Sequence, residues 1–215
     1  MSSIPKLRPG RPGGKRDQNR LRRAGDLRSA GLRLFLARGI DCVPIDDVVK
    51  EAGVAKGSFY RYFKDSADLV DAIFAPLLAQ VDAAFTACES TLNRARSEGD
   101  LFGAYQLLAQ QLAAALLADP QIALLYLQEC RGPATPARAP ILKIALRVRE
   151  KAISLTGIAH KQGLLRPFDG RVSALAVVGA VERLLFGALR GEDVGEADKA
   201  PAALISLILD GLRPR

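Results

Sequence analysis

The chain has 215 residues, 49% of them hydrophobic and 25% charged, which is the composition of a soluble globular protein with one or two domains. The first twenty residues are basic and contain no apolar run, so we expect no secretory signal peptide. The best candidate for a membrane span, residues 172–189, contains Glu182 and Arg183. Because charges are costly inside a bilayer, we expect no membrane partner and a cytoplasmic location.

The residues that usually bind metals or act as nucleophiles are few and scattered. Cys42, Cys88 and Cys130 have no metal-binding spacing, and an odd number cannot form a complete disulfide framework. We interpret them as reduced, partly buried thiols; the alternative, a redox-sensing cysteine, has no feature here that would lower a thiol pKa. His160 is the only histidine and is interpreted as a polar residue near a helix end. We therefore expect no cofactor, no metal and no enzymatic activity.

The net charge of +8 is distributed unevenly along the chain. Residues 1–64 contain 15 lysines and arginines against 6 acidic residues, a net charge of +9, whereas residues 65–215 contain 16 against 17, a net charge of −1. A charge that served solubility alone would have no reason to gather on the first third of the chain. The segregation instead predicts that the amino-terminal part contacts a polyanion.

Residues 1–17 are rich in proline, glycine, lysine and arginine and have no apolar periodicity, so we expect a flexible basic arm. The segment RPGRP, residues 8–12, resembles the AT-hook, although proline precedes the glycine where that motif has arginine. Arginine side chains favour the narrow, strongly negative minor groove of A·T tracts, so Arg8 and Arg11 are predicted minor-groove contacts. The alternative is a tail that adds only non-specific attraction to DNA.

A first helix is predicted over residues 18–38, ended by Gly39 in a left-handed cap. Its apolar residues recur at spacings of three and four, as expected of a helix that packs one face on a core. That stripe consists of Leu21, Ala24, Leu27, Ala30 or Gly31, Leu34 and Phe35.

Two short helices joined by a tight turn come next. Residues 45–52 carry apolar side chains at helical spacing, and Gly53 follows where the chain must reverse direction. In the second helix, residues 56–63, Phe59 and Phe63 are four residues apart and form a buried face. The opposite face is basic, hydroxyl-bearing and aromatic, and the segment contains no acidic residue. Such a helix suits the major groove of DNA.

The run from Leu34 to Val70, which contains GVAKGSFYRYFKDSADLV, resembles the DNA-binding region of the tetracycline-repressor (TetR) family. The motif GVxKGxxYxxFxxxxxL is far more specific than a bare helix-turn-helix pattern. Two departures remove expected phosphate contacts. The family usually has threonine where Val43 or Pro44 stands, and Ala55 replaces a usual serine or threonine. The basic arm would compensate for both.

By this resemblance, Tyr60 and Lys64 contact phosphates, and Arg61 either reads a guanine or neutralises a phosphate; spacing does not decide between the two. Tyr62 lies near the DNA or, alternatively, acts as a lid on the turn. A dimer then needs a palindrome-like operator with half-sites about 34–36 Å apart, or a multiple of that distance. The other predicted contacts, close to bases and backbone, are Lys56, Gly57 and Ser58.

A long helix is predicted after the helix-turn-helix, from the N-cap Asp65 to about residue 89, with a kink at Pro76. Further helices follow over residues 101–118, started by Asp100, residues 120–130, started by Asp119 and Pro120, and residues 137–162, capped by Thr135 and Pro136.

The family resemblance makes residues 71–162 the site of a small-molecule inducer, held in a mainly apolar pocket and coupled through the long helix to the spacing of the DNA-reading helices. Glu129, Arg147, Arg149 or His160 would give the pocket a polar end, and the sequence does not choose among them. The candidate pocket residues are Phe85, Phe102, Tyr105, Tyr126 and Leu146, each of which is alternatively an ordinary core residue.

The last two predicted helices, residues 170–190 and 200–212, are apolar nearly all round. A helix without a polar face must be buried, and two of them need more burial than one small domain supplies. We therefore predict a homodimer with a four-helix interface across a two-fold axis; the alternative is a monomer core. The predicted interface residues are Leu175, Val178, Val181, Leu185, Leu189, Ile205 and Leu209.

These features predict an all-α protein of about nine helices. It comprises a basic arm (residues 1–17), a helix-turn-helix DNA-binding domain (18–64) and a ligand-binding and dimerisation domain (65–215). The predicted function is sequence-specific transcriptional regulation by a nucleoid-associated repressor, which a small, mainly apolar ligand releases from its operator. The alternative is an architectural DNA-binding dimer without an inducer. The predicted partners are double-stranded DNA, a second copy of the chain and a small-molecule effector.

Overall fold

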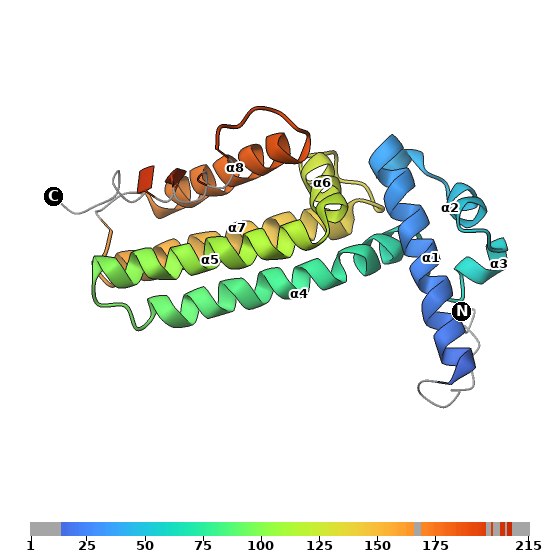
Figure 1. Ribbon diagram of the computed structural model, residues 1–215, viewed down its shortest axis with the longest axis horizontal. Helices are drawn as coiled ribbons and strands as arrows, with labels where there is room; N and C mark the ends of the chain where they lie inside the picture. The colour runs from blue at the N-terminus through green and yellow to red at the C-terminus, as the bar shows by residue number, and fades with distance from the viewer. Residues whose placement is uncertain (1–13, 166–168, 197–198, 200–202, 205, 208–215) are drawn as a thin grey trace.

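The computed structural model describes residues 14–165, 169–196, 199, 203–204 and 206–207, and among these residues there are helices and turns but no strand (Figure 1). The predicted all-α fold class is confirmed. Arg8 and Arg11 of the predicted arm, and Ile205 and Leu209 of the predicted last helix, lie outside the described side chains. In chain order the elements are α1 (Lys15–Arg38), a 3₁₀ turn η1 (Ile40–Cys42), α2 (Ile45–Glu51), α3 (Lys56–Phe59), α4 (Ser66–Leu92), α5 (Glu98–Ala118), α6 (Pro120–Glu129), α7 (Ala139–Lys161) and α8 (Gly170–Leu189).

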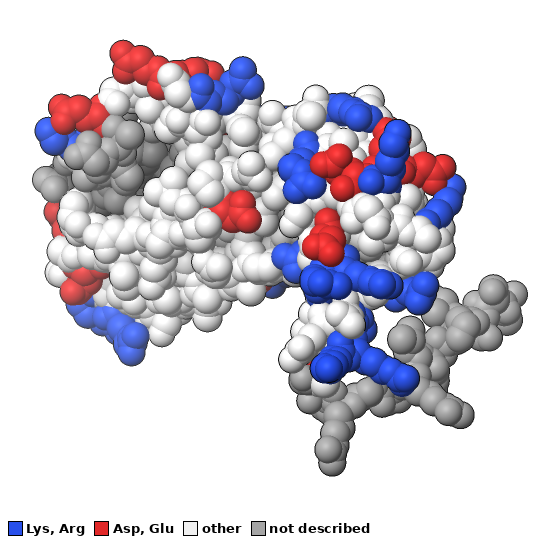
Figure 2. All heavy atoms as spheres, turned by 45° about the vertical axis from the view of Figure 1, so that its right-hand side comes forward, with Lys and Arg blue, Asp and Glu red and all other residues white. Residues whose placement is uncertain are grey.

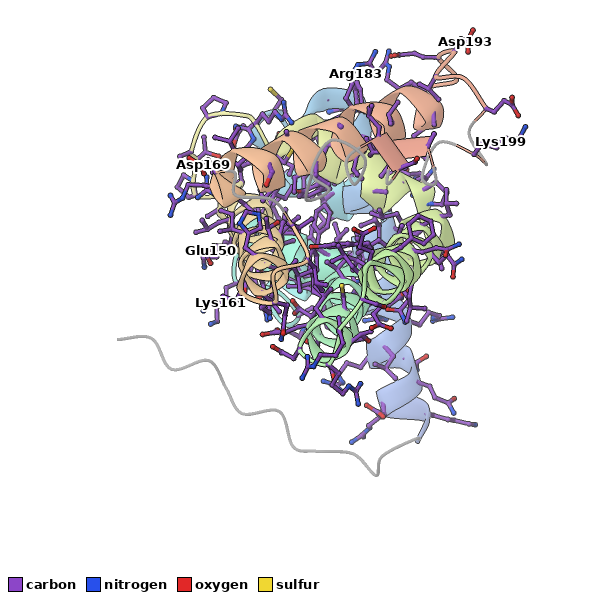
Figure 3. All side chains as sticks on the ribbon, turned by 90° about the vertical axis from the view of Figure 1, so that its left-hand side faces the viewer. Glu150, Lys161, Asp169, Arg183, Asp193 and Lys199 are labelled. Atoms are coloured by element: carbon purple, nitrogen blue, oxygen red, sulfur yellow. The ribbon has the colours of Figure 1, made fainter. Side chains whose placement is uncertain are left out.

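The long helices α4, α5 and α7 lie side by side in an elongated bundle, and α8 packs along α7 (Figure 1). The short helix α6 crosses one end of this bundle, next to α1, and α2 and α3 lie beyond α1 at that end. Figure 3 looks along the bundle and shows side chains filling the space between α4, α5 and α7, whereas Arg183 on α8 points away from it. The architecture therefore presents α1, α2 and α3 at one end of the molecule.

Capping residues explain where several helices begin. Asp65 and Asp119 cap α4 and α6 as predicted, each accepting a hydrogen bond from a backbone N–H three residues on. The start of α5 differs from the prediction, because its N-cap is Ser97 rather than Asp100. The two residues form a reciprocal capping box, in which each backbone N–H donates to the other's side chain at 3.0 and 3.1 Å.

Two hydrophobic cores hold the helices together. The first joins α1, α2 and α3 to the start of α4 and to α6 and α7, and its fully buried side chains include Phe35, Phe59, Phe74 and Leu125. The second lies farther along the bundle, between α4, α5 and α7, around Phe85. The first core crosses the predicted domain boundary at residue 64, so the orientation of α2 and α3 depends on packing against the bundle.

The first helix differs from the prediction at both ends. Leu21 is expected in the core stripe but is 61% exposed, because α1 reaches the body of the protein only at about Leu27, its first fully buried residue. At the other end Gly39 has φ +82° and ψ 152°, which is an extended conformation with positive φ rather than a left-handed helical cap. Glycine is still required there, because residues with a Cβ avoid this region.

Helix α8 is poorly buried within the single chain. Leu175 and Val181 of the predicted interface are 42% and 39% exposed, and Val178, Leu185 and Leu189 are half-buried. By length and composition alone α4, α5 and α8 would each be able to cross a membrane. The sequence analysis considers only the stretch that corresponds to α8. In the folded chain α4 supplies buried side chains to both cores.

Candidate nucleic-acid interface

The turn between α2 and α3 is fixed by its backbone and by the apolar side chains beneath it. Val48, Val49 and Phe59 are at most 6% exposed and pack into the first core. Gly53 has φ +65°, as predicted for the point where the chain reverses. The N–H of Val54 donates to the carbonyl of Val49 at 3.0 Å and closes the turn. The outer side of α3 is therefore held in a defined orientation.

The second helix of the pair is shorter than predicted. Regular helix α3 ends at Phe59, and residues 60–62 continue it as turns. The N–H of Phe63 nevertheless donates to the carbonyl of Phe59 at 3.0 Å, so the chain keeps a helical course. Phe63 is 7% exposed, and its ring centroid lies 5.6 Å from that of Phe59. The predicted buried face is thus present on a less regular segment.

Two of the predicted DNA contacts are turned inward. Ser58 is only 5% exposed, and the guanidinium of Arg61 donates to its hydroxyl at 3.4 Å. Tyr62 is half-buried against the first core, which is the arrangement of a lid on the turn. The other residues of the predicted set are exposed on the outer side: Lys56, Gly57, Tyr60, Arg61 and Lys64.

Lys56 has an acidic partner on the neighbouring helix. Its ammonium lies 2.6 Å from a carboxylate oxygen of Asp46, in the first turn of α2. The hydrogen bond to this carboxylate, and its negative charge, raise the pKa of Lys56 above its ordinary value. Both side chains are more than half exposed, so solvent weakens the pair and a phosphate group would be able to compete for the lysine. Spacing gave no signal for this contact, because it joins two different helices.

The position of Lys64 is set by the start of α4. The backbone N–H of Lys64 donates to Asp68 Oδ2 at 2.9 Å, and the N–H of Asp68 donates to Asp65 Oδ1 at 2.9 Å. These two hydrogen bonds join the end of the helix-turn-helix to the long helix. A movement of α4 would therefore displace Lys64.

A buried ion pair holds the other side of the module. Arg138 Nε donates to Glu129 Oε2 at 2.6 Å, and Glu129 Oε1 accepts from the N–H of Ile40 at 3.3 Å. Arg138 also lies 2.7 Å from Asp41, in η1. Glu129, considered above for the polar end of a ligand pocket, is therefore engaged in linking α6 and α7 to the connection between α1 and α2.

The charge on the surface follows this architecture. Figure 2 shows lysine and arginine side chains gathered on α1 and, with acidic side chains among them, around the end of the molecule that carries α2 and α3. The face of the bundle in the same view is mostly uncharged. An exposed basic surface on a fixed helix-turn-helix has the charge and shape needed to bind duplex DNA.

Comparison with known sequences agrees with this geometry. The family model for bacterial regulatory proteins of the tetR family matches residues 27–73, from the buried part of α1 through α2 and α3 into α4. Residues 27–73 thus form a DNA-binding region of the tetR family type. It is 40% identical to the transcriptional regulator AcuR of Cereibacter sphaeroides over 86 residues, and 38% identical to the TetC protein of transposon Tn10 from Escherichia coli over 53 residues. These alignments cover 36% and 25% of this chain and span 38% of AcuR and 27% of TetC.

Solved structures share the fold of this chain over most of its length. NalD of Pseudomonas aeruginosa, the secondary repressor of the MexAB-OprM multidrug efflux pump, superimposes with a TM-score of 0.69 and 18% identity, covering 90% of this chain and 98% of NalD. FadR of Bacillus subtilis, solved in complex with stearoyl-CoA, gives a TM-score of 0.65 and 15% identity, covering 87% and 98%. At these identities the likeness concerns the fold alone.

The predicted pocket residues do not gather in one place. Phe85 and Tyr105 belong to the second core, and Tyr126 to the first. Phe102 and Leu146 are 40% and 41% exposed. A hollow of about 340 Å³ between the end of α4 and the start of α5 is lined by none of the five.

The polar residues considered for the end of a pocket also lie apart. Arg147 is paired with Asp82 on α4 at 2.8 Å, and Arg149 is exposed. His160 lies near the end of α7, as predicted, and its Nε2 is buried without a hydrogen-bond partner among the described residues.

Proposed function

We propose that this chain is a sequence-specific DNA-binding transcriptional regulator, and that it acts as a repressor. The observation that carries the proposal is the exposed face formed by Lys56, Tyr60, Arg61 and Lys64. It lies on a helix-turn-helix whose opposite side is anchored by the fully buried Phe59. A cationic and hydroxyl-bearing face of this kind suits the major groove, where Arg61 reads a guanine or neutralises a phosphate.

We propose that two copies bind together across a two-fold axis. The exposed apolar side chains of α8 support this, because they would leave water on association. The interface would include Leu175, Val178, Val181, Leu185 and Leu189 of α8, with Ile205 and Leu209 farther along the chain. A symmetric pair needs a palindrome-like operator with half-sites about 34–36 Å apart, or a multiple of that distance.

We propose that residues 18–64 bind DNA and that residues 65–215 dimerise and bind a small, mainly apolar effector. FadR of Bacillus subtilis, which shares this fold, was solved in complex with stearoyl-CoA, and this supports an effector with an apolar part. The ties from α4 to Lys64, and from Glu129 and Arg138 to η1, provide physical connections between the bundle and the helix-turn-helix. A regulator of this kind would act in the cytoplasm, at the nucleoid.

The test begins with the DNA that the purified full-length protein enriches from its own genome. Arg61→Ala and Lys64→Ala should each weaken binding to that DNA by about 5- to 150-fold, or about 1–3 kcal/mol, without loss of helicity. Lys161→Ala is the matched control, because it is exposed at the end of α7 that packs on the second core, away from the helix-turn-helix. If the wild-type protein enriches no DNA even in dilute salt, the proposed function is wrong.

A thermal-shift screen tests the effector. A protein with a ligand pocket should gain thermal stability with some small apolar compound, and the same compound should release the enriched DNA. DNA bending or bridging with no stabilising compound would instead favour an architectural DNA-binding dimer.

A further inference from the structure

The amino-terminal turns of α1 extend beyond the rest of the molecule (Figures 1 and 2). Residues 15–23 are exposed apart from the half-buried Asp17, and they contain five basic residues against one acidic residue, a net charge of +4. This segment precedes residues 27–73, which match the family model. It makes no contribution to either hydrophobic core. Its length and charge therefore need an explanation other than folding.

The arginines of this segment continue a face of α1 that is buried farther along the helix. Going back from Leu27, Arg23, Arg20 and Arg16 follow at spacings of four, three and four residues. Because a helix turns by about 100° per residue, these arginines lie on the same face as the buried Leu27 and Ala30. The face of α1 that is apolar where the helix packs on the protein thus carries a row of arginines in the amino-terminal turns that project from it. Figure 2 shows basic side chains along this part of α1.

These arginines are weakly engaged within the chain. Arg20 lies 3.2 Å from Asp17, three residues away, in an exposed pair that contributes little energy. Arg16 and Arg23 make no ion pair among the described residues, and both are exposed. The row is therefore free to bind an external anion.

We propose that Arg16, Arg20 and Arg23 bind phosphates of duplex DNA just outside the half-site occupied by α3. The inference rests on the proposed function and extends its footprint along the DNA. From Arg16 to Arg23 the helix rises about 10 Å, which matches about three phosphates of one strand at roughly 3.4 Å of axial rise each. The row lies at the same end of the molecule as α3, so one duplex is able to reach both.

An anionic membrane is a poorer partner for this surface. Helices that lie on membranes combine a basic face with a broad apolar face. Residues 15–23 contain one large apolar side chain, Leu21, so insertion of this segment into lipid would bury little apolar area. The charge without an apolar face is the pattern of a phosphate-binding surface.

The test compares two triple variants of the full-length protein that lose the same charge. Arg16→Gln/Arg20→Gln/Arg23→Gln removes the row, and Lys143→Gln/Arg149→Gln/Lys161→Gln removes three exposed charges from α7. Glutamine keeps the helix propensity of both segments, and circular dichroism checks that the fold is intact. The probes are the genomic duplex enriched by the wild-type protein, trimmed to its protected core, and the same duplex with roughly 10 extra base pairs on each side.

On the longer duplex the α1 variant should lower the slope of log affinity against log salt by about 0.9 for each phosphate that it no longer neutralises, so by up to about 2.7. The α7 variant should leave that slope unchanged, and on the trimmed duplex the two variants should bind alike. Equal slopes for wild type and the α1 variant on the longer duplex would overturn the inference.

The Arg61→Ala variant distinguishes failure of this inference from failure of the proposed function. If it weakens binding while the α1 variant does not change the slope, only the inference fails, whereas a wild-type protein that binds neither duplex removes the proposed function.

Discussion

Glu129 and Arg138 form a buried ion pair, with Arg138 Nε 2.6 Å from Glu129 Oε2 and the two side chains only 8% and 10% exposed. The second carboxylate oxygen accepts from the N–H of Ile40, and the guanidinium also reaches Asp41. Residues far apart in the chain are therefore joined at the point where α1 ends and the helix-turn-helix begins. The pair fixes how the DNA-reading module sits on α6 and α7.

Breaking this pair should be costly. Glu129→Ala leaves the buried Arg138 charge with only the partly exposed Asp41 as an acidic partner, and it removes the acceptor of the Ile40 N–H. We therefore expect the free energy of unfolding to fall by about 3–5 kcal/mol in urea denaturation. Glu51→Ala is the control, because it breaks an ion pair with Arg33 that is 2.9 Å long but about half exposed. That change should cost no more than about 1 kcal/mol. Similar losses from both substitutions would show that burial does not decide the value of the Glu129 pair.

The contact between α1 and α4 offers a second test through two glycines of the same helix. A Cβ at Gly31 would lie 2.9 Å from Leu69 Cδ2, and Leu69 is 1% exposed, so it has no free space into which to move. Gly31→Ala should destabilise the protein by about 1–3 kcal/mol despite the better helix propensity of alanine. A Cβ at Gly25 would meet nothing within 4 Å, so Gly25→Ala should stabilise it by about 0.5–1 kcal/mol. Thermal unfolding of both variants measures the difference, and a stabilised Gly31→Ala protein would contradict the packing seen here.

Local signals in the sequence predicted much of the fold. Gly53 at the turn, and Asp65 and Asp119 at helix starts, were identifiable because capping and positive φ depend on residues that are neighbours in the chain. The spacing of Phe59 and Phe63 likewise predicted the buried side of the second helix.

These local signals do not predict contacts between elements that are distant in the sequence. Nothing periodic connects Lys56 to Asp46, or Glu129 to Ile40, because such pairs depend on how whole helices pack. The inward position of Ser58 has the same origin, since the core beneath α3 decides how much of each side chain remains exposed. Leu21 was misplaced because helical periodicity gives the face of a residue but not where the neighbouring helices end.

The cysteines provide a prediction that depends on pH. Burial raises the pKa of Cys88 to about 12 and also raises that of Cys130, whereas Cys42 is exposed. Because the thiolate is the reactive form, iodoacetamide at about pH 8 should label the folded protein at Cys42 and the other two only after unfolding. Mass spectrometry with a Cys42→Ser control checks this. Rapid labelling of folded Cys88 would contradict its burial.

The same burial should destabilise the protein in alkali. The pKa of Cys88 in the folded protein lies above its unfolded value of 9.0, so the unfolded state releases the proton first as the pH rises. The stability that comes from keeping this thiol neutral is complete below pH 9 and is lost as the pH approaches 12. In urea titrations above pH 9, Cys88→Ala should therefore lose less stability than the wild type. Parallel losses in the two proteins would contradict the raised pKa.

The proposed dimer predicts that a charge on α8 separates the subunits. Val181 and Leu175 are 39% and 42% exposed in the single chain, although both are apolar and lie in the proposed interface. Val181→Glu would bury a carboxylate against the apolar residues of the partner, so the variant should become monomeric in sedimentation experiments over a dilution series. It should also lose affinity for the palindrome-like DNA, because each copy would then bind one half-site alone. Ala114→Glu adds the same charge at an exposed position of α5 and should leave both the dimer and DNA binding intact. A Val181→Glu protein that stays dimeric would place the interface on a different surface.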